Sequence, residues 1–412
     1  MPQAAVLILA TALLSGVSYG AENYELDIFG SLDVENLWYP QNGAYAEQRA
    51  YATGFVAKPK LFLTDYDGSW SIQIAPFFRL DTADSQRTHA DLREAYFLVF
   101  GEIGDGEWEM RLGVDRVFWG VTESQHLVDI INQTDLVENP NRESKLGQPM
   151  AHLTWSTERG IMEFFALTYH RARTFPGVHG RLRSSILIDD EHIEYESAAG
   201  EWHVDLAARY SNSFGPFDVG LSVFDGTNRD PVFMPNLDAD GTLSLVQHYE
   251  QIRQYSMDGQ LTIESWLFKL EALRREGASN LMGAKEDYTA FVLGGEYTFN
   301  SVLGSAADFG LLAEWNYDLR QEREHSSTEF QNDMFLAVRL ALNDTQSTNL
   351  IAGILADMDY STRTLSMVLK RRISDQWSLN LETIVFMDVD EKDIIYTTRR
   401  DSFIALNLTY NF

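Results

Sequence analysis

The 412-residue chain has no cysteine. This absence excludes disulfide bonds, thiolate metal sites and cysteine nucleophiles. Long apolar runs are absent after the first residues, hydrophobic residues make up an ordinary 45%, and mean hydropathy is slightly negative. A helical membrane protein needs apolar runs of about 20 residues. The chain is therefore either soluble or crosses a membrane with strands that hide their apolar residues by alternation.

Basic residues are also scarce. The 32 Lys and Arg stand against 61 Asp and Glu, which gives a formal net charge of -29. So acidic a chain is a poor binder of nucleic acid. Aromatic residues are plentiful at 12%, with 18 Tyr and 9 Trp. Such a surplus is typical of the aromatic girdles of a membrane β-barrel.

The N-terminus has the pattern of a secretory signal peptide. An apolar core spans 4–14, and the small residues Ser18 and Gly20 precede a potential cut before Ala21. The pattern predicts a signal peptide over 1–20 and a mature barrel over 21–412. A single N-terminal membrane anchor is the alternative.

Apolar and polar residues alternate with a period of two along most of the mature chain. In one segment, Phe309, Leu311 and Trp315 lie on one face and Asp308 and Glu314 on the other. This period is that of a half-buried β-strand. Its sustained repetition exceeds what the core of a soluble sandwich uses, and it predicts an all-β, transmembrane antiparallel β-barrel.

The spacing of the turns favours the same fold. Every second connection is short and rich in turn residues, whereas those near 39–48, 120–148, 171–200 and 227–248 are long. Short periplasmic turns and long extracellular loops are typical of outer-membrane barrels, which have even strand numbers. We expect about 18 strands, with 16 as the alternative. Their expected ranges are 24–38, 50–64, 69–81, 91–101, 107–119, 149–157, 160–170, 201–212, 216–226, 249–263, 265–275, 286–299, 307–320, 331–343, 347–358, 361–373, 376–390 and 399–412.

The last strand is the most specific local signal. Its alternate residues Ile404, Leu406, Leu408, Tyr410 and Phe412 are all apolar or aromatic. The pattern looks like the C-terminal signature of outer-membrane barrels, which the barrel-assembly machinery reads. We therefore expect Tyr410 and Phe412 to act as an assembly signal in the outer membrane of a Gram-negative bacterium. The end strand of a soluble domain is the alternative.

In its architecture the whole mature chain resembles the bacterial porin superfamily. The resemblance rests on the export signal, the antiparallel strands, the alternating turns and loops and the terminal Phe412. The segment 116–120, running into 129–135, is similar to the loop entry of large substrate-transporting barrels. The resemblance identifies no solute. It implies that the third extracellular loop, 120–148, folds into the lumen and narrows it.

This loop is acidic and partly apolar. Its apolar residues between 127 and 136 predict a short folded helix. Its acids, which we expect at the constriction, are Glu123, Asp129, Asp135, Glu138 and Glu143.

Basic residues are expected on the facing wall. If the apolar set faces lipid, four adjacent strands present Lys58, Lys60, Arg79, Arg93 and Arg111 to the lumen. An acidic loop opposite a basic wall would set a transverse field across the constriction. The alternative is that these bases pair with lumenal acids such as Glu109 and Asp115 and only stabilise the wall. Because the rest of the lumen is mostly acidic, we expect a bulk preference for cations with an anionic or zwitterionic solute held locally.

One turn has part of a calcium-binding pattern. Asn236, Asp238 and Asp240 precede Gly241 as in the first half of an EF-hand loop, but Gln247 stands where the bidentate Glu belongs. A solvated acidic turn is the first interpretation and a structural calcium ion the alternative. We expect no other cofactor.

The leading hypothesis is a passive channel for small hydrophilic solutes, because no room is expected for a plug domain before the first strand. The alternative is a non-conducting barrel acting as receptor, adhesin or accessory export component. A rim hydrolase, using a pair such as Ser124 and His126, is a third. Expected partners are outer-membrane lipid and lipopolysaccharide, the barrel-assembly machinery and the solute. The oligomeric state stays open.

Overall fold

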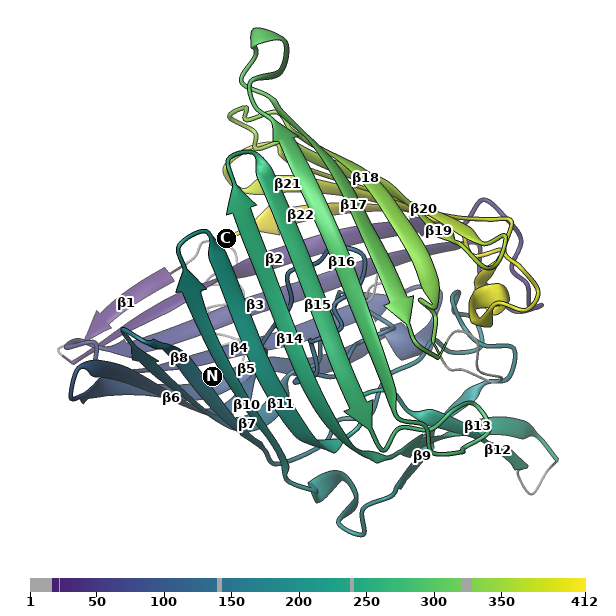
Figure 1. The fold of residues 1–412 in the computed structure, drawn as a ribbon, viewed down its shortest axis with the longest axis horizontal. Helices are drawn as coiled ribbons and strands as arrows, with labels where there is room; N and C mark the ends of the chain where they lie inside the picture. Colours follow the sequence, from purple (N-terminus) through teal and green to yellow (C-terminus); the bar gives the residue numbers. More distant parts are fainter. Residues whose placement is uncertain (1–16, 22, 139–142, 238–240, 321–327) are drawn as a thin grey trace, which may run out of the picture.

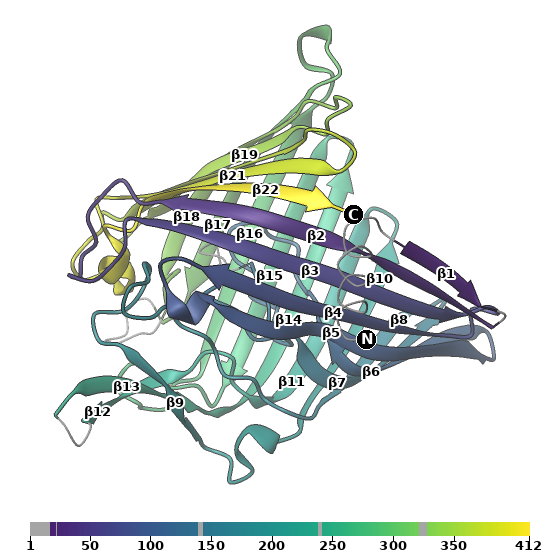
Figure 2. The ribbon, with the colours of Figure 1, turned by 180° about the vertical axis from the view of Figure 1, so that it is seen from behind.

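Eighteen strands form one closed antiparallel barrel. The computed structural model describes residues 17–21, 23–138, 143–237, 241–320 and 328–412. Each barrel strand pairs with its neighbours along the chain, and β22 pairs back to β2 through Trp38↔Ile404 to Ser31↔Asn411. Figure 2 shows this seam, with purple β2 beside yellow β22. The predicted all-β barrel of 18 strands is confirmed, and 16 strands are excluded.

The barrel strands have the following bounds: β2 (Tyr24–Trp38), β3 (Tyr51–Asp65), β4 (Trp70–Asp81), β5 (His89–Ile103), β6 (Gly106–Asp115), β7 (Gln148–Thr157), β8 (Gly160–Leu167), β10 (Asp205–Phe214), β11 (Phe217–Thr227), β14 (Gln251–Ile263), β15 (Trp266–Glu276), β16 (Tyr288–Phe299), β17 (Asp308–Asp318), β18 (Asn332–Ala341), β19 (Asn349–Asp357), β20 (Arg363–Arg372), β21 (Trp377–Met387) and β22 (Phe403–Asn411). The remaining strands are β1 (Val17–Ala21), β9 (Ile188–Tyr195), β12 (Val232–Leu237) and β13 (Leu243–Tyr249). Four short 3-10 helices complete the elements: η1 (Ser85–Arg87), η2 (Gly200–Trp202), η3 (Val302–Gly304) and η4 (Ile394–Thr398).

Period-two alternation places apolar residues outside and polar residues inside. On β14, Tyr255 and Met257 are exposed on the outer face, whereas Gln254, Ser256 and Asp258 are buried. In a membrane barrel, apolar side chains that are exposed on the outer face of the strands contact lipid. The sequence pattern therefore predicted correctly which residues of the strand face outward and which face inward.

Aromatic residues gather at the ends of the strands that the short turns join. Trp70, Trp266 and Trp377 are each the first residue of their strand, and Trp377 contacts Tyr410 with ring centroids 5.1 Å apart. This row matches one of the two interfacial girdles expected of a membrane barrel.

Several strand ends differ from the expected ranges. The strand expected over 107–119 ends at Asp115, the one expected over 399–412 begins at Phe403, and the one expected over 201–212 is β10. Residues 116–119 leave the wall because their backbone donors bond to side chains inside the barrel, as Val117 does to Asn132. Alternation does not register such tertiary partners, and so the loop begins earlier than expected.

A small sheet outside the barrel was not predicted. β12 pairs antiparallel with β13, which pairs parallel with β9. Figure 1 shows this sheet beyond the end of the barrel that carries the long loops. β1 pairs with the first third of β2, from Val17↔Ile28 to Ala21↔Tyr24. It overlaps the expected signal peptide, whose boundary stays a prediction.

Within the described residues, no helix is long and apolar enough to cross a membrane.

Candidate functional site

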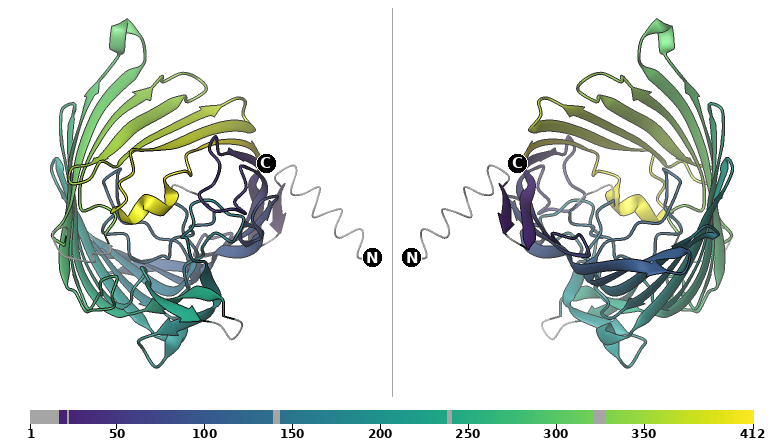
Figure 3. Two further views of the ribbon diagram at one scale, coloured as in Figure 1. Left: turned by 90° about the vertical axis from the view of Figure 1, so that its right-hand side faces the viewer. Right: turned by 90° about the vertical axis from the view of Figure 1, so that its left-hand side faces the viewer.

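The third long loop, loop 3 (116–147), folds into the barrel. Figure 3 looks along the barrel and shows loop segments inside the ring of strands. Val128, Ile130 and Ile131 of loop 3 are almost completely buried, and they belong to one apolar cluster with Phe165 and Phe224 of the inner wall. The inward fold that the resemblance implied is therefore present. The expected helix is wrong: residues 127–136 form turns, bends, isolated bridges and irregular backbone, and no helix.

Glu271 of β15 clamps the middle of loop 3. Its Oε1 accepts hydrogen bonds from Val121 N, Thr122 N and Thr122 Oγ1 at 2.7–3.0 Å, and its Oε2 accepts one from Val128 N at 3.2 Å. The residue is completely buried. Buried backbone N–H groups need hydrogen-bond acceptors, and here the carboxylate of Glu271 supplies them. The loop therefore does not depend on the internal hydrogen bonds of a helix.

Glu314 of β17 clamps the next residues. It accepts from Glu123 N at 2.9 Å and from Ser124 N and Oγ at 2.8 and 2.7 Å. The carboxylate of Glu123 in turn contacts Lys269 of β15 and Arg339 of β18, at 3.0 and 2.9 Å. Loop 3 thus spans the lumen from β6 to the wall formed by β15, β17 and β18.

Burial of Glu123 would raise its pKa, but the charges and hydrogen bonds of Lys269 and Arg339 outweigh burial and hold the pKa below its usual value. Glu123 therefore faces basic residues of β15 and β18, and its partners are not among the five bases named from the sequence.

Arg79 ties the other end of loop 3 to the wall. Its Nη1 donates to Oε2 of Glu35 at 2.6 Å, and its Nε lies 2.9 Å from Oε2 of Glu138. Arg87 also donates to Glu35 and pairs with Asp81. All these side chains are buried, so the network fixes loop 3 against β2 and β4.

Arg93 makes the same kind of contact. Its Nη2 donates to Oδ2 of Asp135 at 2.6 Å, and Thr174 Oγ1 donates to Oδ1 of the same carboxylate at 2.7 Å. Burial of Asp135 would raise its pKa, but Arg93 outweighs burial and lowers it. The acids and bases expected to face each other across a gap are here in direct contact. Their role in a constriction stays a prediction.

The other expected residues are more exposed. Lys58 pairs with Asp33 at 3.0 Å, and Lys60 lies 3.9 Å from Glu94. Arg111 pairs with Glu109 and Asp115 at 2.7 and 3.1 Å. This is the pairing expected under the alternative in which the bases only stabilise the wall.

The two remaining loop acids differ in their surroundings. Asp129 pairs with Lys145 of its own loop at 2.9 Å. Glu143 is exposed.

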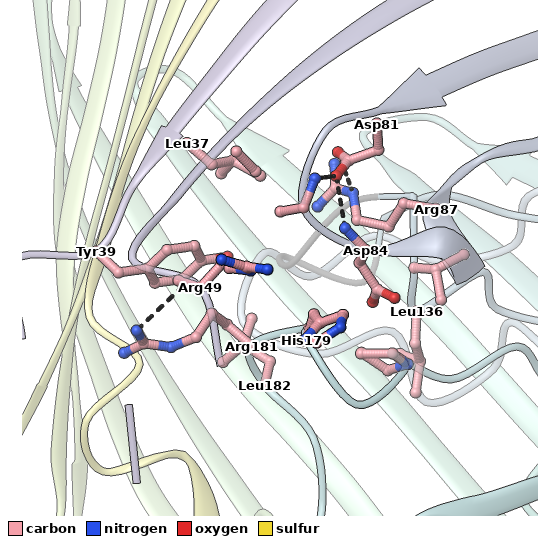
Figure 4. Close-up of a pocket in the computed structure, with 15 residues that line it drawn as sticks. Leu37, Tyr39, Arg49, Asp81, Asp84, Arg87, Leu136, His179, Arg181 and Leu182 are labelled. Atoms are coloured by element: carbon pink, nitrogen blue, oxygen red, sulfur yellow. Dashed lines mark hydrogen bonds and ion pairs between the residues drawn. The ribbon is translucent and has the colours of Figure 1, made fainter. Parts of the chain in front are cut away.

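A further long loop, loop 4 (168–204), joins β8 to β10 and extends across the mouth of the barrel. It reaches from β8 to loop 9 (388–402), where Nε of Arg181 donates to Oδ1 of Asp401 at 2.7 Å and Leu182 N donates to Oδ2. The Arg181 guanidinium also stacks over Tyr39, 4.5 Å from the ring centroid. Figure 4 shows Tyr39, Arg181 and Leu182 beside a small void of about 30 Å³. Figure 3 shows η4 of loop 9 inside the ring as well.

The sequence interpretation missed Glu271 and the contact between Arg181 and Asp401. Glu271 could have been found, because it follows Lys269 on the inward face of a strand that was predicted correctly. Nothing local marks Arg181 or Asp401, since their pairing depends on how two long loops meet.

The remaining candidates have plain outcomes. The Ser124 hydroxyl donates to Glu314, and the His126 ring lies edge-on to Phe118, so the pair that a rim hydrolase would use is not formed. Asn236 lies on β12, whereas Asp238 and Asp240 lie outside the described residues. Elsewhere in the described chain, no three His, Asp or Glu residues gather as a metal site. Calcium stays an untested expectation.

The C-terminal residue closes the barrel. Phe412 N donates to Gly30 O, and Gly30 N donates to Phe412 O, both at 3.1 Å. Recognition of Tyr410 and Phe412 by assembly machinery stays a prediction.

The closed 18-stranded antiparallel barrel, with its third long loop folded inward, has a porin-type fold. Among solved structures, the chain is similar to an engineered variant of the Rhodobacter blastica porin, with 8% identity over 94% of this chain and 100% of that chain and a TM-score of 0.44. It is also similar to the outer membrane protein OmpT of Vibrio cholerae, with 10% identity over 95% and 100% of the two chains and a TM-score of 0.47. No protein-family model and no curated protein matches the chain. The class therefore rests on the barrel itself.

Proposed function

We propose that the chain is a passive channel for small hydrophilic solutes in the outer membrane of a Gram-negative bacterium. The observation that carries the proposal is a closed barrel whose inner face is lined by charged side chains, several of which remain exposed to water. Lys58, Arg111 and Arg339 are examples. Barrels of 16–18 strands are wide enough to enclose an aqueous channel.

Loop 3 would set the width of this channel. It is held at the far wall by Glu271 and Glu314 and at the near wall by Arg79 and Arg93. A loop fixed on both sides divides the lumen and leaves a narrower path beside it. The apolar outer belt would contact lipid and lipopolysaccharide, and the strand ending at Phe412 would be read during assembly.

The second candidate is a non-conducting barrel that acts as receptor, adhesin or accessory export component. The crossing of loop 4 over the mouth favours it, because the buried pair of Arg181 and Asp401 holds this loop in place. The small sheet of β9, β12 and β13 also extends the surface outside the barrel.

Single-channel conductance in a planar bilayer distinguishes the two. We expect steady conductance in potassium chloride and, under a salt gradient, a reversal potential that indicates cation preference, because the chain carries a net charge of -29. Folded, heat-modifiable protein that never conducts would remove the channel and favour a role for the loops. Conductance with anion preference would retain the channel and overturn the predicted selectivity.

A further inference from the structure

The backbone pairing between β3 and β4 is interrupted at one point. The two strands pair from Gly54↔Asp81 to Ala57↔Phe78, and pairing resumes only at Leu61↔Ile74. In this register Pro59 falls opposite Pro76. Proline has no N–H to donate to a ladder, so two facing prolines interrupt it.

The next strand is irregular beside this gap. The register of β4 and β5 shifts between Ala75↔Glu94 and Pro76↔Leu92, which leaves Arg93 as an extra residue. A bulge of this kind turns two consecutive side chains toward one face. Arg93 and Glu94 are both buried on the lumenal side, where they contact Asp135 and Arg116.

A cavity of about 160 Å³ lies at the gap, between the wall and loop 3. Its apolar lining residues are Pro59, Ala75, Pro76 and Phe77, and of these Ala75 and Phe77 are buried on the inner face of β4. Its charged lining residues are Lys58, Lys60, Arg93, Arg116, Lys145 and Glu138.

The basic side chains of this cavity are more exposed than the acidic side chains with which they pair. The side chain of Lys58 is 43% exposed and that of its partner Asp33 only 2%. Lys60 and Arg116 are 37% and 39% exposed, against 11% for Glu94, with which both are paired. An entering solute therefore meets ammonium and guanidinium groups, while the compensating carboxylates are buried behind them.

Lys60 keeps capacity for a further anion. Its ammonium lies 3.9 Å from Glu94, which is beyond hydrogen-bond distance. The carboxylate of Glu94 already accepts hydrogen bonds from Arg116 and Gln73.

We propose that this basic cavity binds a small organic carboxylate, with Lys60 and Arg116 as its principal contacts and Ala75 and Phe77 beside its apolar part. The inference rests on the proposed channel, because it assigns a solute class to one point on the path. The inward apolar lining of Ala75 and Phe77 favours an organic carboxylate over an inorganic anion, since an apolar surface gives a bare ion nothing to bind. Binding here is compatible with a bulk preference for cations, because the cationic surface is local.

Calorimetric titration of the folded barrel in detergent tests the site without requiring conduction. We expect succinate to bind and its neutral analogue succinamide not to bind. Replacing both contacts in Lys60→Gln/Arg116→Gln should weaken succinate binding by about tenfold or more, because hydrogen bonds between charged groups are lost. Lys370→Gln is the matched control, since Lys370 lies on β20 and does not line the cavity. It should leave binding unchanged.

The same proteins are then tested in the bilayer, where succinate should reduce the current of the native channel and of Lys370→Gln but not that of the double variant. Conduction without succinate binding, or equal binding of succinate and succinamide, would overturn the carboxylate site and keep the channel. Succinate binding without conduction would retain the site and overturn the channel. Inorganic phosphate that binds as tightly as succinate would overturn the organic part of the proposal.

Discussion

Arg181 and Asp401 lie 220 residues apart in the sequence, yet Nε of Arg181 donates to Oδ1 of Asp401 at 2.7 Å with both side chains almost fully buried. The pair joins loop 4 to loop 9 across the mouth of the barrel. Arg181 also donates to backbone carbonyls of Gln41 and Arg400, so three loops meet at one guanidinium. This contact makes loop 4 a fixed cover at the long-loop end.

Asp401→Asn should release loop 4. Loss of a hydrogen bond between charged groups costs about 1.5–3 kcal/mol, which shifts the ratio of undocked to docked loop by about 10- to 100-fold. Hydrogen exchange at 176–187 should accelerate and single-channel conductance should rise. Asp390→Asn, in the same loop, is the matched control. Unchanged exchange in Asp401→Asn would show that loop 4 is held by its other contacts.

Glu271→Ala should free the middle of loop 3. The change leaves the donors of Val121, Thr122 and Val128 without their acceptor, at about 1–3 kcal/mol for each buried group. We expect a wider pore, measured as faster entry of larger neutral sugars into proteoliposomes. Glu276→Ala, on the opposite face of the same strand, should behave as the native channel. If the Glu271 variant admits the same sugars as the native protein, loop 3 does not set the pore width.

Arg79→Met should destabilise the barrel as a whole. It leaves Glu35 and Glu138 as buried charges that lack this partner, a loss of about 3–5 kcal/mol in the free energy of unfolding. Urea unfolding from detergent micelles measures the effect. Arg372→Met, on the exposed end of β20, should change the free energy by much less. Equal losses in both variants would mean that the buried network contributes no more to the free energy of unfolding than an exposed arginine does.

Acid should loosen loop 3 only at low pH. The pKa values of Glu123 and Asp135 in the folded protein lie below their usual values. Their stabilising contribution is therefore complete above about pH 5 and is lost as pH falls through the usual and then the lowered values. Protease cleavage of loop 3 should stay constant from pH 7 to about 5 and increase below about 4, measured by pulses of an acid-active protease. In Glu123→Gln/Asp135→Asn this dependence should flatten. A transition near pH 6 would point to histidine instead.

Much of the barrel followed from local pattern. Alternation in segments such as 249–263 and 376–390 placed β14 and β21 to within a few residues. A strand exposes one face to lipid and the other to the lumen. The polarity of each residue therefore indicates which face it lies on, whatever its neighbours in space are. The same rule placed Arg79 and Arg93 on the inner wall.

The loops did not follow from local pattern. The strand expected to reach residue 119 stops at Asp115 because Val117 N bonds to Asn132, fifteen residues away. The small sheet of β9, β12 and β13 joins segments of two loops, and no local period predicts that pairing.

The sequence by itself determined the barrel and which residues of each strand face outward or inward, charged residues included, because period-two alternation is a property of each strand alone. Only the tertiary structure decided what those charges do. Arg79 and Arg93 are consumed in contacts with loop 3, whereas Lys60 and Arg116 remain at the front of a cavity. The difference depends on the distance between side chains that lie far apart in the chain, and Coulombic and hydrogen-bond energies are set by that distance and by burial.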